Sequence, residues 1–251
     1  MKKALIAASC AALLSATVQA DVLGIYVGGS VWQQETSGEY GERGNLADFN
    51  LADETKANLY AAFEHPAPFV PNVKLAIADL DSQGQTVLTD DFSFQDGFFP
   101  AGSTVDGTFD LSYVDYTFYY ELLDNGLASL DVGLTARDVD GFANVRSSVN
   151  AQTVSASQDF SGFLPMLYSA AEIGLPFTGL SLYAEANMLI LDDDSFIDAQ
   201  AGLAYALIDN IAVDVNLFVG YRQVTVDIED FDDIYADMEY KGAYAGAEIH
   251  F

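Results

Sequence analysis

The chain has 251 residues, of which 51% are hydrophobic, and 38 Asp and Glu against 9 Lys and Arg give a formal net charge of −29. This negative charge repels phosphate and excludes a nucleic-acid binder, while 17 Phe and 14 Tyr exclude an acidic disordered tail. The length allows one or two soluble domains or a single barrel, so the pattern of residues decides the class.

The first twenty residues have the three parts of a secretory signal peptide. Lys2 and Lys3 precede an apolar run that ends at Ala16, and Val18-Gln19-Ala20 is a cleavage pattern. We expect residues 1–20 to be removed and 21–251 to form one domain. Cys10 lies in the removed segment, so disulfides are not expected. No later run of 18 apolar residues predicts a membrane-spanning helix.

Alternation of apolar and polar residues with a period of two recurs along the remaining chain and predicts β-strands. The ten predicted strands are Val22–Gln34, Thr55–Glu64, Asn72–Leu80, Thr108–Leu123, Leu127–Asp138, Leu164–Leu175, Leu180–Leu191, Ile197–Ile208, Ile211–Asp227 and Ala236–Phe251. A helix would not show this period. Any single segment is also compatible with a soluble sandwich.

The connections between these strands alternate between short and long. The short turns are 65–71, 124–126, 176–179 and 209–210. The long, polar connections are 36–54, 81–107 and 139–163, followed by two acidic ones, 192–196 and 228–235. A sandwich does not predict this asymmetry, whereas an outer-membrane barrel does. The sequence therefore predicts an all-β fold: a transmembrane antiparallel up-and-down β-barrel of ten strands with short periplasmic turns and longer acidic extracellular loops.

The last predicted strand ends in a pattern that carries a family resemblance. Gly246, Ile249 and the terminal Phe251 resemble the assembly signal of bacterial outer-membrane proteins. The chain as a whole is similar to the uncharacterised small outer-membrane β-barrel proteins of Gram-negative bacteria. The resemblance implies insertion by the barrel-assembly machinery into the cell outer membrane, with outer-membrane lipid and lipopolysaccharide as partners. It implies nothing about a specific activity, because the fold does not supply the function.

Two histidines limit the possible chemistry. His65 lies in a predicted periplasmic turn and His250 is the penultimate residue, so neither is expected at the extracellular mouth. Hydrolytic outer-membrane enzymes generally need a histidine beside a carboxylate or serine. The omptins, a family of ten-stranded outer-membrane proteases, are a poor match, because their Asp–His pair lies on the extracellular side. We therefore expect no catalytic residues and no enzymatic activity.

Acidic clusters in the last two extracellular loops raise the question of metal binding. Hard divalent cations prefer oxygen ligands, but no calcium-loop spacing is present. Solvated acidic loops are one interpretation, since a run of charge is a weak signal. Loose Ca²⁺ or Mg²⁺ shared with lipopolysaccharide phosphates is another, and no other cofactor is expected. The residues concerned are Asp192, Asp193, Asp194, Asp230, Asp232 and Asp233.

A group of charged residues is expected inside the barrel from strand parity. These residues are Lys56, Lys74, Asp115, Glu121, Asp131, Arg137, Glu172, Glu185, Asp214 and Arg222. A ten-stranded barrel is near the size at which the interior changes from filled to open. If filled, the charges form a structural plug with paired ions. If open, the excess carboxylates favour cations.

The long loop around Phe92–Pro100 is unusual because it carries four phenylalanines where polar residues are expected. It either folds inward as a plug or dips into the lipid headgroups. Three functions follow from the sequence. The first is a non-enzymatic barrel with a structural or surface-interaction role, and the alternative is a narrow cation-selective or small-solute channel. An outer-membrane enzyme is the third.

Overall fold

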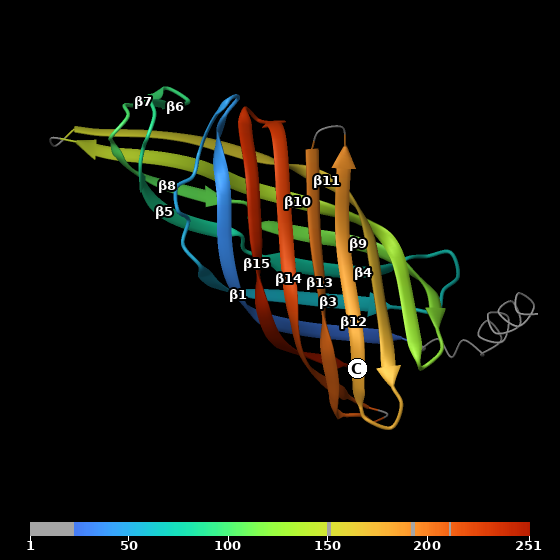
Figure 1. Cartoon of the computed structure of the whole chain (residues 1–251). Coiled ribbons are helices and arrows are strands. Elements are labelled where there is room, and N and C mark those ends of the chain that lie inside the picture. Colours follow the sequence, from blue (N-terminus) through green and yellow to red (C-terminus); the bar gives the residue numbers. More distant parts are fainter. Residues whose placement is uncertain (1–22, 150–151, 192–193, 211) are drawn as a thin grey trace, which may run out of the picture.

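A computed structural model describes residues 23–149, 152–191, 194–210 and 212–251, and the regular elements of this part are strands (Figure 1). The strands are β1 (Gly24–Glu42), β2 (Asn45–Ala47), β3 (Glu54–Glu64), β4 (Asn72–Ala78), β5 (Asp81–Val87), β6 (Phe92–Phe94), β7 (Gly97–Phe99), β8 (Thr104–Asp110), β9 (Tyr113–Asp124), β10 (Ala128–Val149), β11 (Gln152–Leu175), β12 (Leu180–Leu191), β13 (Asp194–Ile208), β14 (Asp214–Phe231) and β15 (Ile234–His250). Within these residues, no helix is long and apolar enough to cross a membrane.

Ten of these strands form a closed antiparallel barrel. Their order is β11, β12, β13, β14, β15, β1, β3, β4, β9 and β10, and the pairing of β10 with β11 closes the ring. The fold class and the number of barrel strands predicted from the sequence are confirmed. The predicted signal peptide, residues 1–20, lies outside the described residues.

The short turns lie together at one end of the barrel, which we call the short-turn end. They follow β3, β9, β11 and β13. Gly126 and Gly179 have φ of 71° and 70°, a conformation in which glycine carries no steric penalty. The chain also ends here, because Ile25 and Phe251 exchange two backbone hydrogen bonds of 3.2 and 3.0 Å.

The connections at the other end are long, as predicted, but most residues of 36–54, 81–107 and 139–163 lie in strands rather than in loops. β1 continues to Glu42, β10 and β11 fill most of 139–163, and β5 to β8 occupy much of 81–107. The acidic segment 228–235 contains the ends of β14 and β15, and Asp232 and Asp233 form its turn with φ of 53° and 66°. The predicted strand Thr108–Leu123 is divided between β8 and β9, which are separated by Leu111 and Ser112.

The outward surface of the barrel changes character along the strands. Near the short-turn end it is apolar, and exposed residues include Val27 and Val31 on β1 and Leu134 on β10. Farther along β1 the exposed residues are polar and include Glu35 and Glu39. A transmembrane strand needs about 9–11 residues, whereas β11 has 24. The apolar belt is therefore the membrane-spanning part, and the strands project well beyond it on one side.

The projecting part has its own hydrophobic core, which we call the outer core. Tyr40 of β1 stacks on Phe49 at 4.5 Å and lies 5.1 Å from Phe109 of β8. Phe160 of β11 continues the contact to Phe109 at 5.9 Å and to Phe231 of β14 at 6.0 Å. These contacts join strands from opposite sides of the barrel, so side chains fill the interior at this level.

The hairpin of β6 and β7 completes the outer core. Phe92, Phe94 and Phe99 are buried in it, while Phe98 is 56% exposed. Asn45 Nδ2 donates to the carbonyl of Ser93 at 3.3 Å, which ties the hairpin to β2. The phenylalanine-rich segment therefore packs inward at the far end of the projection, away from the apolar belt.

Candidate functional site: the barrel lumen

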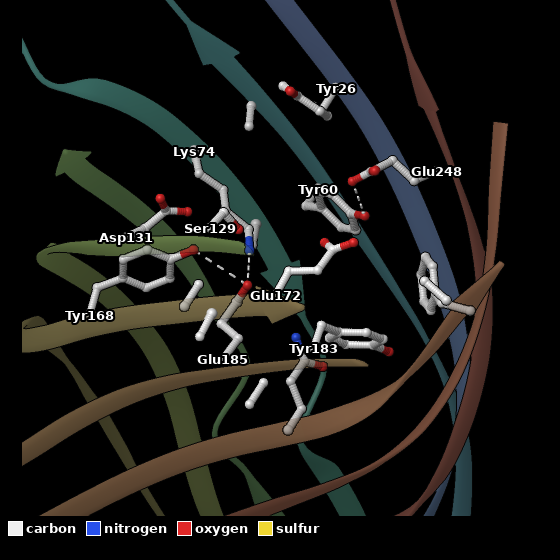
Figure 2. A pocket seen from close by; sticks show the side chains of 18 of the residues that line it. Tyr26, Tyr60, Lys74, Ser129, Asp131, Tyr168, Glu172, Tyr183, Glu185 and Glu248 are labelled. Carbon is white, nitrogen blue, oxygen red and sulfur yellow. Dashed lines mark hydrogen bonds and ion pairs between the residues drawn. The ribbon is translucent and has the colours of Figure 1, made fainter. Parts of the chain in front are cut away.

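The inside of the barrel at the short-turn end holds a polar cavity of about 480 Å³ (Figure 2). Tyrosines from several strands line it, among them Tyr60 of β3, Tyr168 of β11 and Tyr183 of β12. Small inward residues such as Ala62 of β3 and Ala170 of β11 lie between the large ones and leave the space open. The cavity therefore lies inside the membrane-spanning belt.

Lys74 projects into this cavity and is held there by three side chains. Its Nζ donates to Glu185 Oε2 at 2.5 Å. It also lies 5.1 Å from the ring centroid of Tyr60 and 5.6 Å from that of Tyr168, within the range of cation–π attraction. Lys74 is thus paired with a carboxylate between aromatic faces (Figure 2).

The cavity lining carries far more negative than positive groups. Nine carboxylates contribute to it, with Lys74 and Arg222 as the two cations. The carboxylates are Glu64, Asp115, Glu121, Asp124, Asp131, Glu172, Glu185, Asp198 and Glu248. Several are satisfied by tyrosine hydroxyls: Tyr60 donates to Glu248 and Tyr119 to Glu64, each at 2.7 Å. Asp131 Oδ1 is buried without a hydrogen-bond partner among the described residues.

A layer of four charged side chains forms the roof of the cavity. Arg137 donates to Asp115 through Nε and Nη2 at 2.8 and 2.7 Å, and Nη2 also donates to Asp198 at 2.8 Å. Arg222 donates to both oxygens of Asp198 at 2.9 and 2.7 Å. We call Asp115, Arg137, Asp198 and Arg222 the ion-pair layer. Bidentate contacts of this kind are strong and geometrically specific.

Aromatic rings pack against both arginines of the ion-pair layer. The Arg137 guanidinium lies 3.5 Å from the ring centroid of Tyr113 and 4.6 Å from that of Phe196. The Tyr113 hydroxyl donates to Asp198 at 2.6 Å, and Arg222 lies 4.9 Å from the ring of Trp32. Arg137, Trp32 and Phe196 are fully or almost fully buried. The layer therefore separates the cavity from the outer core.

Beyond the layer, the outer core contains buried polar groups of its own. Tyr40, which lies outside the membrane-spanning belt, points its hydroxyl at the carbonyls of Thr108 at 3.2 Å and Asn144 at 2.9 Å. Burial raises the pKa of Tyr40 well above its ordinary value. It therefore stays a neutral hydrogen-bond donor that links β1 to β8 and β10.

The residues predicted to form one lumen cluster separate into four places. Lys74, Glu121, Asp131, Glu172 and Glu185 line the cavity. Asp115, Arg137 and Arg222 belong to the ion-pair layer.

The other two predicted lumen residues pair elsewhere. Lys56 donates to Asp81 at 2.5 Å, and Asp214 lies 3.4 Å from His250 Nδ1 at the short-turn end. Asp198 was not among the predicted residues, although it has the inward parity of the predicted strand Ile197–Ile208.

Only some of the acidic residues predicted to bind a cation loosely have described side chains. Asp192 and Asp193 lie outside the described residues, as does the side chain of Asp230. Asp194 accepts a hydrogen bond from the backbone of Glu229 at 2.7 Å, and Asp232 accepts one from Ser161 at 3.4 Å. The described side chains contain no group of three or more His, Cys, Asp and Glu residues arranged to hold a metal ion.

The predicted assembly-signal residues lie on the final strand. Gly246 pairs with Ser30 and Phe218, and a Cβ there would approach the carbonyl of Gly29 to 2.3 Å, so only glycine fits. Ile249 and Phe251 are exposed at the short-turn end.

Both histidines lie at the short-turn end. The ring of His65 lies 5.9 Å from that of Phe63 in the turn after β3. The ring of His250 stacks on Tyr26 at 4.1 Å. The end opposite the turns therefore has no histidine among its described residues.

No protein-family model matches the sequence, and no curated protein matches it. Among solved structures, the fold resembles the outer membrane protease OmpT from Escherichia coli with a TM-score of 0.50 and 10% identity, over 94% of this chain and 98% of that one. The translocator domain of the autotransporter NalP from Neisseria meningitidis gives a TM-score of 0.45 and 10% identity, over 100% and 96% of the two chains. The chain thus has the fold of an outer-membrane β-barrel.

Proposed function

We propose that this protein is an integral outer-membrane β-barrel with a closed lumen, and that it acts as a non-enzymatic surface-interaction protein through its projecting strands. The observation that carries this proposal is the outer core. Tyr40, Phe94 and Phe109 are fully buried there and fill the interior on the extracellular side of the ion-pair layer. A solute that entered from the periplasm would have to displace both the layer and the core.

Stability supports a closed lumen. Opening the ion-pair layer would separate Arg137 from Asp115 and Asp198 inside the barrel, and leaving one buried charge unpaired costs about 3–5 kcal/mol. The outer core would also lose its aromatic contacts. A closed barrel whose strands extend far beyond the membrane offers its outer surface, rather than its interior, for function.

The position of the histidines supports a non-enzymatic role. OmpT is a protease, and a shared barrel fold does not transfer its activity, because function resides in the site. His65 and His250 are at the short-turn end, in contact with Phe63 and Tyr26. Neither can take part in a catalytic pair on the extracellular side.

A narrow cation-selective channel is the second candidate, and one observation favours it. The cavity holds nine carboxylates against two cations, and such a lining attracts cations. This function would require a second conformation in which the outer core is displaced.

Conductance of the folded protein in a planar bilayer tests the proposal. A shift in gel mobility on heating first shows that the barrel is folded. A closed barrel gives no discrete current steps under a KCl gradient. Cation-selective current steps that disappear in the double variant Asp131→Asn, Glu185→Gln would overturn the proposal of a closed lumen and support the channel. Hydrolysis of peptide or lipid A substrates by the purified protein would overturn the non-enzymatic role.

We also propose export through cleavage of residues 1–20, insertion by the barrel-assembly machinery, and loose Ca²⁺ or Mg²⁺ between the acidic turns and lipopolysaccharide phosphates. Such ions would screen the repulsion between Asp232, Asp233 and a negatively charged lipid surface. Retention of the protein in lipopolysaccharide vesicles should fall when EDTA is added and recover when Mg²⁺ is restored.

A further inference from the structure

The strand β11 has one side that is only partly occupied. It pairs with β10 along almost its whole length, from Gln152 to Ile173. On its other side it pairs with β12 only from Leu167 to Leu175. Within the described ranges, residues 152–166 have no strand partner on that side. β10 and β11 run together into the projection, away from β12 (Figure 1).

Three hydrogen bonds establish which backbone groups of β11 point to this side. Gly174 N donates to Leu127 O, so even-numbered residues point their backbone groups toward β10. Asp140, the partner of Ser161, donates its N–H to Ser112 on the far side of β10. Ser161 N donates to Asp232, away from β10. Because the β10–β11 pairing has no register shift, Ser155, Ser157 and Asp159 share this outward direction.

Only one end of this edge is covered by the rest of the chain. Asp232 accepts the N–H of Ser161, and a Cβ on Gly162 would approach the Phe231 ring to 3.1 Å. Among the described residues, no other element covers the stretch from Ser155 to Asp159 in this way, although the side chain of Gln158 donates from Nε2 to the Asp159 carbonyl at 3.2 Å. Sheet edges are usually protected by charges, proline or a bulge, but the only charge here is Asp159, and Pro165 lies farther along the strand.

We propose that Ser155–Asp159 of β11 is a docking edge for an extended, lysine- or arginine-bearing peptide segment of another protein, which adds as a strand. Strand addition uses backbone hydrogen bonds for affinity and alternate side chains for specificity. Asp159 and Asp140 are exposed on the outer face beside the edge and favour a cationic partner. A second copy of the chain would bring like charges together, because each copy carries a net charge of −29.

This inference rests on the proposed surface-interaction role and assigns it a partner class. Its test is independent of conductance, because it addresses the outer edge rather than the lumen. The full chain is refolded in neutral detergent, and a fluorescent peptide of alternating Thr and Val with two Lys is titrated by anisotropy. The same peptide with Glu in place of Lys is the charge control.

Two variants at one position isolate the backbone contact. Ser157→Pro removes an outward N–H and is tolerated on an edge strand, whereas Ser157→Ala keeps this N–H. We expect Ser157→Pro to raise the Kd about fivefold to tenfold, which corresponds to one lost hydrogen bond, and Ser157→Ala to leave it unchanged. The Glu peptide should bind more weakly than the Lys peptide, and bound Lys peptide should slow hydrogen exchange at Ser155, Ser157 and Asp159.

Three results would overturn the inference. The first is Lys-peptide binding that Ser157→Pro leaves unchanged. The second is slow amide exchange at Ser155–Asp159 in the free protein, which would mean that the edge is already covered. The third is a dimer in analytical ultracentrifugation that Ser157→Pro dissolves, which would make the occupant a second copy. Channel activity in the absence of these three results would overturn the proposal of a closed lumen, and the proposal of a docking edge would still stand.

Discussion

Arg137 is joined to Asp115 by two parallel hydrogen bonds, Nε to Oδ1 at 2.8 Å and Nη2 to Oδ2 at 2.7 Å, at the level where the polar cavity meets the outer core. The two residues face each other across neighbouring strands β9 and β10. The same guanidinium reaches Asp198 on β13, so a single side chain links β9 and β10 to a strand that is not their neighbour in the barrel. The ion-pair layer therefore braces the barrel at this level.

Removing Arg137 should destabilise the barrel strongly. In Arg137→Ala, Asp115 loses its cation, Asp198 keeps only Arg222, and we expect the free energy of unfolding to fall by about 3–5 kcal/mol. Trp32, the only tryptophan, lies 4.9 Å from Arg222, so its fluorescence during urea unfolding in vesicles reports on this region. Lys56→Ala is the control, because Asp81 is 46% exposed and the pair should contribute less than about 1 kcal/mol. Equal losses in the two variants would contradict a special role for the layer.

The phenylalanine hairpin offers a matched test of the outer core. Phe94 is fully buried and Phe98 is 56% exposed on the same hairpin. Phe94→Ala should lower the free energy of unfolding by about 3–5 kcal/mol, as expected for a buried phenylalanine, whereas Phe98→Ala should have little effect. Limited proteolysis of 90–101 gives a local readout. If Phe94→Ala is cut no faster than Phe98→Ala, the hairpin does not depend on the core contact.

The fold was predictable from the sequence because the apolar belt imposes a period of two where strands face lipid. The same rule failed in the projection, where the outward face is solvated and the inward face of β10 has small residues such as Gly141 and Ala143. The apolar residues that reveal a strand are therefore few in this segment, and its sequence resembles that of a polar loop. Pairing with β11 on one side and with β8 on the other holds this segment as a strand.

The site was predictable only in part, for a related reason. Parity placed Arg137, Arg222 and Asp115 inside the barrel, but it did not show which of them pair, because a salt bridge depends on the register between strands. Asp198 contacts both arginines from β13, 61 residues from Arg137 and 24 from Arg222. The outer core could not be predicted for the same reason, because it depends on contacts across the lumen such as the one between Tyr40 and Phe109.

Gly242 is expected to tolerate no side chain. A Cβ there would lie 1.8 Å from the carbonyl of Gln33, and the Gly242 carbonyl accepts the Trp32 Nε1 hydrogen bond at 3.1 Å. Gly242→Ala should prevent folding, as seen by loss of the heat-dependent gel shift. Gly102→Ala, where φ is 82° and no atom is within 4 Å, should cost only about 1–2 kcal/mol. If the Gly242→Ala protein folds, β1 and β15 must lie farther apart at this position than they do in the structure.

Leu134 and Asp140 test the edge of the membrane-spanning belt on a single strand. Both point outward from β10; Leu134 is 65% exposed and apolar, while Asp140 is exposed in the projection. A charge facing lipid costs about 2–4 kcal/mol near the bilayer centre and little outside it. Leu134→Arg should therefore lower the free energy of unfolding in vesicles by up to this amount, and Asp140→Arg should leave it nearly unchanged. A comparable loss from Asp140→Arg would move the belt outward along β10 and place part of the projection within the membrane.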